Sequence, residues 1–175
     1  MAIDVRKILS GEMDKLAISH SFSLTDGDFP FDTELDGVVF TKPAAVIGEI
    51  VNMGGYITLD VTASVDYDAE CARCLKPLSR RFETSFSRTL INRGDLVNTA
   101  EEDADDYIEA VDGLLDIETV AAEQIMMEFP MKELCDENCK GLCPKCGRDL
   151  NAGDCGCVKK EIDPRLAILQ KLLEK

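Results

Sequence analysis

The stretch ITLDVTASVDY, residues 57–67, decides the fold, because apolar and polar residues alternate along its whole length. The odd-numbered positions carry Ile, Leu, Val, Ala, Val and Tyr, whereas the even-numbered positions carry Thr, Asp, Thr, Ser and Asp. Successive side chains of a β-strand point to opposite faces of a sheet. A period of two therefore predicts a strand in a sheet that has one covered face.

Four further segments have the character of strands, namely residues 16–24, 34–41, 44–51 and 78–91. The turn Asn-Met-Gly-Gly at 52–55 is expected to join the segment 44–51 to the strand at 57–67, because Asn and Gly tolerate positive φ. Residues 3–9 fit either a short helix or an edge segment. These elements predict an α+β protein. Its core is an antiparallel β-sheet or a partly open barrel, with a few helices and a C-terminal cysteine-rich zinc-binding module.

Residues 94–131 differ from the preceding strands, since they hold twelve acidic residues and no Lys, Arg or His. Residues 98–106 are expected to form a mobile loop. A helix is predicted to begin after the N-cap Asp116 and to end at Pro130. A last helix is expected after Asp163-Pro164. We therefore divide the chain into an antiparallel β domain with its acidic loop and helix, residues 1–131, and a zinc module with the C-terminal helix, residues 132–175, packed on the first.

The composition narrows the class of partner and the compartment. The net charge of −15 disfavours unassisted binding to nucleic acid or to anionic membranes, and it suits basic partners. The first residues do not have the pattern of a signal peptide, and no stretch of about 18 apolar residues is present. We therefore expect a cytoplasmic protein that does not enter membranes.

Eight cysteines dominate the chemistry of the chain. Six lie in the stretch ELCDENCKGLCPKCGRDLNAGDCGC at 133–157, and an earlier CARC supplies the other two. In a reducing compartment this number indicates metal ligands rather than four disulfides. Structural zinc takes four ligands, often two from each of two short turns. The predicted metal ligands are Cys71, Cys74, Cys135, Cys139, Cys143, Cys146, Cys155 and Cys157, for one or two structural Zn²⁺ ions.

Two pairings of these thiols are open. In the local pairing, Cys143 and Cys146 share an ion with Cys155 and Cys157, and the CARC pair binds with Cys135 and Cys139. In the rival pairing, the CARC pair binds with Cys143 and Cys146. We favour the local pairing, because the glycines and Asn151 between the knuckle and the last pair suit a short closing loop.

The chain lacks the signatures of common enzymes. It contains no GxxxxGK[ST], GxGxxG, HExxH or GxSxG motif, and its single histidine, His20, is expected to have only a surface or packing role. With a cysteine for every coordination position, an open catalytic zinc is not expected. We therefore predict that the protein is not an enzyme. A thiol redox or metal-handling protein is the alternative that eight cysteines also fit.

Basic residues are concentrated near the cysteines. The candidate contacts to RNA or phosphate are Arg73, Lys76, Arg80, Arg81, Lys140, Lys145 and Arg148. The competing interpretation is that the basic stripe at 73–93 pairs with the acids of 94–131 inside the fold.

Several motifs together resemble the bacterial YceD family, the large-subunit ribosomal RNA accumulation proteins. They are Cys71-Ala-Arg-Cys74-Leu, the run from Leu134 to Gly147, then Asn151, Cys155 and Cys157, and finally Asp163-Pro-Arg165-Leu with Leu169. The resemblance covers most of the chain. It implies a role in ribosome biogenesis, with no enzymatic activity and with relatives in plastids.

We therefore predict a non-enzymatic factor that supports accumulation of large-subunit ribosomal RNA. The expected partner is a basic ribosomal protein or a pre-ribosomal large-subunit particle, with RNA contact secondary, because an acidic protein can hold a basic one without trapping RNA. The alternative is a zinc-stabilised RNA-binding protein. The oligomeric state is not predicted.

Overall fold

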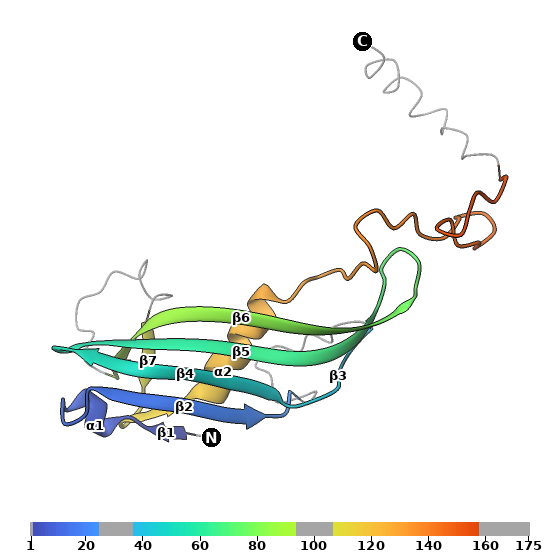
Figure 1. Cartoon of the computed structure of the whole chain (residues 1–175). Helices are drawn as coiled ribbons and strands as arrows, with labels where there is room; N and C mark the ends of the chain where they lie inside the picture. Colours follow the sequence, from blue (N-terminus) through green and yellow to red (C-terminus); the bar gives the residue numbers. More distant parts are fainter. Residues whose placement is uncertain (1, 25–36, 94–106, 158–175) are drawn as a thin grey trace, which may run out of the picture.

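The computed structural model describes residues 2–24, 37–93 and 107–157. Figure 1 shows a long, curved sheet, a helix behind it, and an irregular C-terminal segment that extends from one end of the sheet. The elements in chain order are β1 (Ala2–Asp4), α1 (Arg6–Leu9), β2 (Lys15–Phe22), β3 (Val38–Phe40), β4 (Ala44–Met53), β5 (Tyr56–Glu70), β6 (Pro77–Asn92), β7 (Tyr107–Ala110), β8 (Leu114–Asp116) and α2 (Ile117–Glu128).

The six-stranded sheet has the order β2-β4-β5-β6-β7, and its sixth strand, β3, also pairs with β5. The strand predicted from residues 57–67 lies at its centre and is longer than expected. One edge of β5 pairs with β4 through residues 56–64 and then with β3 through residues 67–69. Lys42-Pro43 separates β3 from β4, because proline cannot donate a hydrogen bond to the ladder.

The sheet is antiparallel, as predicted, except at one edge. β7 pairs with β6 in parallel, with Thr89 opposite Tyr107. A strand that pairs in parallel with its predecessor needs a crossover connection. Such a connection cannot be predicted from a local turn motif. A separate two-stranded sheet of β1 and β8 was also not predicted, and residues 3–9 prove to hold both part of β1 and the short helix α1.

Burial along β5 follows the predicted alternation. Its odd-numbered side chains from Ile57 to Ala69 are buried, whereas most of its even-numbered side chains are partly or fully exposed. Ser64 is the exception, and its hydroxyl accepts a hydrogen bond of 2.8 Å from Arg81 Nη2. The sheet therefore has one covered face and one largely open face.

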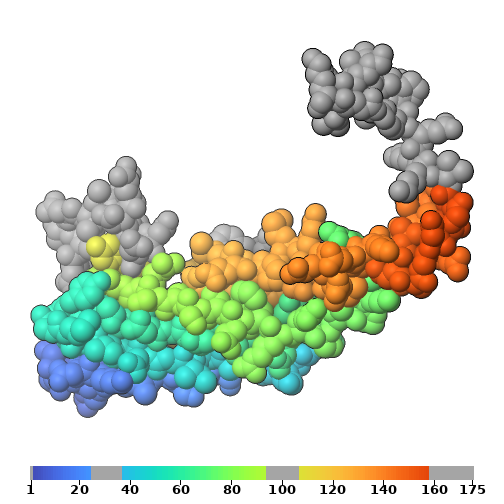
Figure 2. Space-filling model, turned by 45° about the horizontal axis from the view of Figure 1, so that its top comes forward, coloured from blue at the N-terminus to red at the C-terminus, as the bar shows by residue number. Residues whose placement is uncertain are grey.

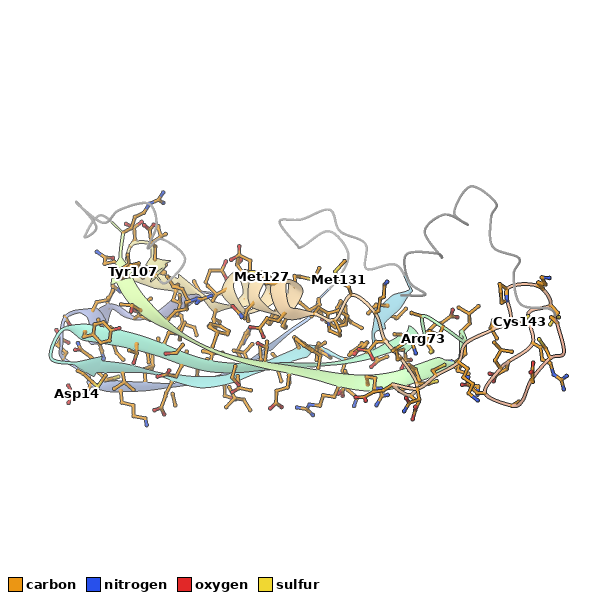
Figure 3. All side chains as sticks on the ribbon, turned by 90° about the horizontal axis from the view of Figure 1, so that it is seen from above. Asp14, Arg73, Tyr107, Met127, Met131 and Cys143 are labelled. Carbon is orange, nitrogen blue, oxygen red and sulfur yellow. The ribbon has the colours of Figure 1, made fainter. Side chains whose placement is uncertain are left out.

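Helix α2 covers the apolar face, as Figure 3 shows. Asp116 is the predicted N-cap, and its Oδ1 accepts a hydrogen bond of 3.5 Å from the backbone amide of Thr119. Helical geometry ends at Glu128, two residues before Pro130. The side chains of Ile117, Ala121 and Ile125 on the inner face of α2 are fully buried.

Phe129 fixes the chain where it leaves α2. Its ring lies 4.8 Å from that of Tyr67, 5.3 Å from that of Phe82 and 5.8 Å from that of Phe40, measured between centroids. The three partners come from three different strands. These contacts direct residues 130–135 along the sheet towards the end where β5 meets β6.

The single histidine has the packing role that the sequence predicted. His20 on β2 is half-buried, and its Nε2 lies 2.5 Å from Glu118 Oε1 on α2. The pair joins the sheet to its covering helix.

Two predicted elements, the loop at 98–106 and the helix after Asp163-Pro164, lie outside the described residues, and the boundary at residue 131 stays a prediction. Among the helices that the structure describes, none is long and apolar enough to cross a membrane.

Candidate metal centres

The first group of thiols joins two distant parts of the chain. Cys71 and Cys74 lie in the connection between β5 and β6, and Cys135 and Cys139 follow α2. The Sγ atoms of Cys71 and Cys139 are 3.9 Å apart, and those of Cys74 and Cys135 are 3.5 Å apart. All four Sγ atoms lie within 4.8 Å of one another.

The second group closes locally at the far end of the molecule. Cys143 and Cys146 meet Cys155 and Cys157, again with all four Sγ atoms within 4.8 Å of one another. Figure 3 shows Cys143 on this outer loop, beyond Arg73 at the end of the sheet. The structure thus groups the eight thiols as the local pairing predicts and not as the rival pairing does.

The donor set and its spacing fit zinc. A Zn–S bond of about 2.3 Å in a tetrahedron places the sulfurs about 3.8 Å apart, close to the two distances in the first group. A disulfide needs sulfurs about 2.05 Å apart, and all eight cysteines are free. Four thiolates leave no position for a substrate, so each group suits a structural ion rather than a catalytic one.

Both CxxC turns have the same backbone geometry. In the first turn the amide of Cys71 donates to Lys76 O and the amide of Leu75 donates to Cys71 O, at 2.9 Å each. In the second, the amide of Cys143 donates to Arg148 O at 2.8 Å and that of Gly147 donates to Cys143 O at 2.9 Å. The repetition identifies two knuckles of one type.

Backbone amides favour one thiolate in each group. The amide of Cys135 is the main cause that lowers the pKa of Cys71 to about 6, and the amide of Cys146 does the same for the pKa of Cys143, also to about 6. Neighbouring thiols have the opposite effect on one other cysteine of each group, whose pKa they raise. The neighbouring Cys139 thiol is the main cause that raises the pKa of Cys135 to about 12, and Cys146 acts likewise on the pKa of Cys157, also to about 12.

Few apolar side chains support these turns. Among the described residues, the apolar side chains packed against the first group are Leu78, Leu134 and Leu142, apart from the cysteines themselves. The described residues that follow contribute no buried apolar side chain beyond Cys143. A segment with so little core would need metal ions bound at the two cysteine groups for a fixed structure.

Comparison with known proteins identifies the family to which these turns belong. The family model described as "Large ribosomal RNA subunit accumulation protein YceD" matches residues 59–173, which run from β5 through both knuckles. The chain belongs to the YceD family. The matched range includes both strands that flank the first CxxC turn and all eight cysteines.

Curated relatives of the YceD chain are found in bacteria and in plants. An uncharacterized protein of Mycobacterium tuberculosis, Rv2926c, is 33% identical over 125 residues, which are 71% of this chain and 58% of the relative. The uncharacterized protein YlbN of Bacillus subtilis is 31% identical over 135 residues, covering 77% of this chain and 76% of YlbN. A chloroplastic protein of Arabidopsis thaliana, "Large ribosomal RNA subunit accumulation protein YCED homolog 1", is 34% identical over 61 residues, 35% of this chain and 19% of the relative.

The match to this YceD chain therefore spans little more than half of the mycobacterial relatives' length. No solved structure matches it.

In this YceD chain, the module at 133–157 is hydrogen-bonded to the end of the sheet. The amide of Ala72 donates to Glu133 O at 2.8 Å, and the amide of Leu142 donates to Arg73 O at 3.0 Å. The hydroxyl of Tyr67 donates to Glu133 Oε1 at 2.6 Å. Burial is the main cause that raises the pKa of Tyr67 well above its usual value, and this hydrogen bond is the next. Figure 2 shows the segment lying against β6 and projecting beyond it.

Three of the predicted phosphate contacts, Arg73, Lys76 and Arg80, also bond to the module, and their contact with RNA stays a prediction. Arg73 Nη1 donates to Cys139 O at 2.8 Å and to Glu137 O at 3.1 Å, and Arg80 Nη2 donates to Leu134 O at 3.3 Å. Lys76 Nζ lies 3.0 Å from Asp149 Oδ2. The sequence does not reveal these contacts, because they depend on how the module packs against the end of the sheet.

The other predicted contacts remain at the surface. Arg81 is exposed beside Ser64, and Lys140, Lys145 and Arg148 are exposed around the second group of thiols. The expected pairing of the stripe 73–93 with later acids is present at Arg93, whose Nε lies 3.9 Å from Glu109 Oε2. Two further participants, Glu133 and Gly141, have no distinguishing signal in the sequence.

Gly141 is expected to be less tolerant of substitution than Gly147. Both have φ of +72°, but a Cβ at position 141 would lie 2.8 Å from Arg73 O, whereas a Cβ at 147 would meet nothing within 4 Å. G147A should cost only the left-handed backbone conformation, about 1–2 kcal/mol. G141A adds a steric conflict with Arg73 O, where the module is hydrogen-bonded to the sheet, and should cost roughly 2–4 kcal/mol. Denaturant unfolding with zinc present measures the free energy of unfolding of the two variants. Equal destabilisation would contradict the close approach of residue 141 to Arg73 O.

Zinc affinity is expected to increase with pH. Thiolates bind the metal, so every thiol proton must leave on binding. Cys135 and Cys157, whose pKa values are raised to about 12, hold protons at pH 7 in the metal-free clusters and release them to the buffer. Below about pH 6, Cys71 and Cys143 are also protonated and binding weakens further. Calorimetric titration with Zn²⁺ in buffers of different ionisation enthalpy measures this release, and a pH-independent Kd between pH 6 and 8 would contradict it.

Proposed function

We propose that the protein is a non-enzymatic factor in ribosome biogenesis that supports accumulation of large-subunit ribosomal RNA. The observation that carries this proposal is the family match over residues 59–173, which includes the central strands and both cysteine groups. The names of the plant relatives state the same role for those proteins. This role supports a cytoplasmic location, because the protein would act where ribosomes assemble.

The proposed partner is a basic ribosomal protein or an assembly intermediate that displays one. The net charge of −15 supports this choice, since an acidic surface attracts basic segments and repels bare RNA. Acidic side chains also reach the open face of the sheet, where Asp60 and Glu83 are exposed on β5 and β6. A protein of this kind can hold a ribosomal component until its RNA site is ready.

Zinc has a structural part in this proposal. Both cysteine groups fill four positions with thiolates, so the metal holds the module at 133–157 against the sheet and does no chemistry itself. The working surfaces are then the charged faces that this scaffold positions.

Direct RNA contact is the second candidate, and a particular observation favours it. Lys140, Lys145 and Arg148 are exposed around the second centre, and none of them forms an ion pair among the described residues. Arg73 and Arg80 are already bonded to module carbonyls, so these three residues are the better phosphate contacts.

Deletion of the gene in its host, followed by measurement of the ratio of large- to small-subunit ribosomal RNA, tests the proposed function. We expect a lower ratio and fewer free large subunits in sucrose gradients, with both restored by the wild-type gene. A ratio unchanged by deletion would overturn the proposal.

Charge reversal distinguishes the two modes of action. The triple variant K140E/K145E/R148E is compared with K132E, which changes an exposed lysine immediately before the module. If RNA is held directly, the triple variant should lower RNA retention and reduce the salt slope by up to about three, one for each basic side chain that no longer binds a phosphate. If the protein acts through a basic protein, both variants should restore the deletion strain and co-purify the same ribosomal protein at low salt.

A further inference from the structure

The loop between the two cysteine pairs of the second centre, residues 147–154, lies against the first centre. Asn151 Nδ2 is 3.4 Å from Cys139 Sγ, which places an amide donor on a sulfur of the first centre. Asn151 Oδ1 accepts from the amide of Lys140 at 2.7 Å. One side chain therefore binds both a sulfur of the first centre and the backbone next to it.

Asp149 holds this asparagine in place. Its Oδ1 accepts from the Asn151 amide at 2.9 Å and from Asn151 Nδ2 at 2.8 Å. Its Oδ2 lies 3.0 Å from Nζ of Lys76, which follows the CARC turn. The loop of the second centre thus contacts the first centre through a carboxylate and an amide.

The backbone continues the same contact. Leu150 N donates to Gly141 O at 2.9 Å, and Leu142 forms an isolated antiparallel bridge with Asp149. Leu150 is only half-buried, and the loop has no fully buried side chain. Its conformation therefore depends on closure at both ends by Cys146 and Cys155, which the second metal ion provides.

From this geometry we infer that the two metal centres are coupled, with Asn151 as a positioning residue that the second centre supplies to the first. An ion in the second centre orders the loop, and the ordered loop presents Asn151 to Cys139. Groups that hydrogen-bond to a metal ligand change metal affinity about 10- to 100-fold. Thermodynamic linkage makes the effect reciprocal, so an ion in the first centre raises the affinity of the second by the same factor.

Site-resolved alkylation tests the coupling on the full chain. The protein is equilibrated in buffers of fixed free Zn²⁺, alkylated, and read peptide by peptide, so that protection of Cys71, Cys74, Cys135 and Cys139 reports the first centre alone. Removing the second centre with C155S/C157S should weaken Zn²⁺ binding at the first centre about 10- to 100-fold. Removing the first centre with C71S/C74S should weaken the second by the same factor.

Single substitutions separate the coupling from general damage to the module. N151A keeps all eight thiols and should weaken the first centre about tenfold. N151D should weaken it further, since a carboxylate would then face the Cys139 sulfur. D154A is the matched control, because Asp154 Oδ1 accepts only from the amide of Gly156 among the residues that the structure describes, and it should leave the first centre unchanged.

Unchanged affinity of the first centre in C155S/C157S would overturn the inference, as would equal behaviour of N151A and D154A. Hydrogen exchange of β5 is measured in every variant to show that the sheet is intact. If C155S/C157S loses that protection, the comparison of N151A, N151D and D154A decides the question.

Discussion

Removal of zinc with a chelator at neutral pH is expected to unfold residues 133–157 while β4, β5 and most of β6 stay folded. A structural zinc ion contributes roughly 10–16 kcal/mol in small zinc-binding peptides. Apart from its hydrogen bonds to the sheet, the described part of the module has few apolar contacts, and these involve Leu78, Leu134 and Leu142 around the first group. The sheet, in contrast, has its own core beneath α2, including Leu59 and Ile125.

Hydrogen exchange read by mass spectrometry measures this result directly. Peptides that cover 133–157 should exchange fully after chelation, and peptides from the middle of β5 should keep their protection. Returning Zn²⁺ should restore the module. Loss of protection throughout β5 would contradict the account, because the sheet would then depend on the metal and the two parts would not be separable. Full protection of the module without metal would contradict it as well.

Truncation of Phe129 is expected to produce the largest loss of stability among single changes in the β domain. The side chain is 6% exposed and contacts aromatic rings from three strands. Replacing such a residue by alanine typically costs about 3–5 kcal/mol, because removal of the ring leaves a cavity. F129A should also release the chain that leads from α2 to the first cysteine group.

The matched control for F129A is M131A, two residues later, where the side chain is 96% exposed. That change should alter the free energy of unfolding by no more than about 0.5 kcal/mol. Urea unfolding followed by circular dichroism gives both values, and F129A should also lower the melting temperature by roughly 10 °C. Equal effects of the two substitutions would show that the ring cluster does not anchor the helix end.

Alternation of residue types predicted most of the sheet. The period of two in β5 is retained in the structure because one face of that strand is packed on α2 and the other is open. β7 could not be predicted in the same way. It is four residues long, lies in a strongly acidic region and pairs in parallel after a connection outside the described residues. Its place is set by the tertiary fold and not by local propensity.

The cysteine groups were partly predictable. Spacing alone favoured closure of Cys143 and Cys146 with Cys155 and Cys157, because a short loop with turn residues can join them. The contacts of Arg73 and Arg80 with the module were not predictable, since their partners are backbone carbonyls 66 and 54 residues away in the chain. Basic residues beside a knuckle have the same pattern in a sequence whether they bind RNA or their own chain.

Anomalous scattering at the zinc edge, measured on crystals of the purified protein, tests the central claim that the eight cysteines form two zinc centres, the first of which fastens the module to the sheet. The account predicts two zinc peaks per chain. One is bound by Cys71, Cys74, Cys135 and Cys139, and the other by Cys143, Cys146, Cys155 and Cys157. Disulfides among these cysteines, or a zinc ion shared by Cys71, Cys74, Cys143 and Cys146, would contradict it.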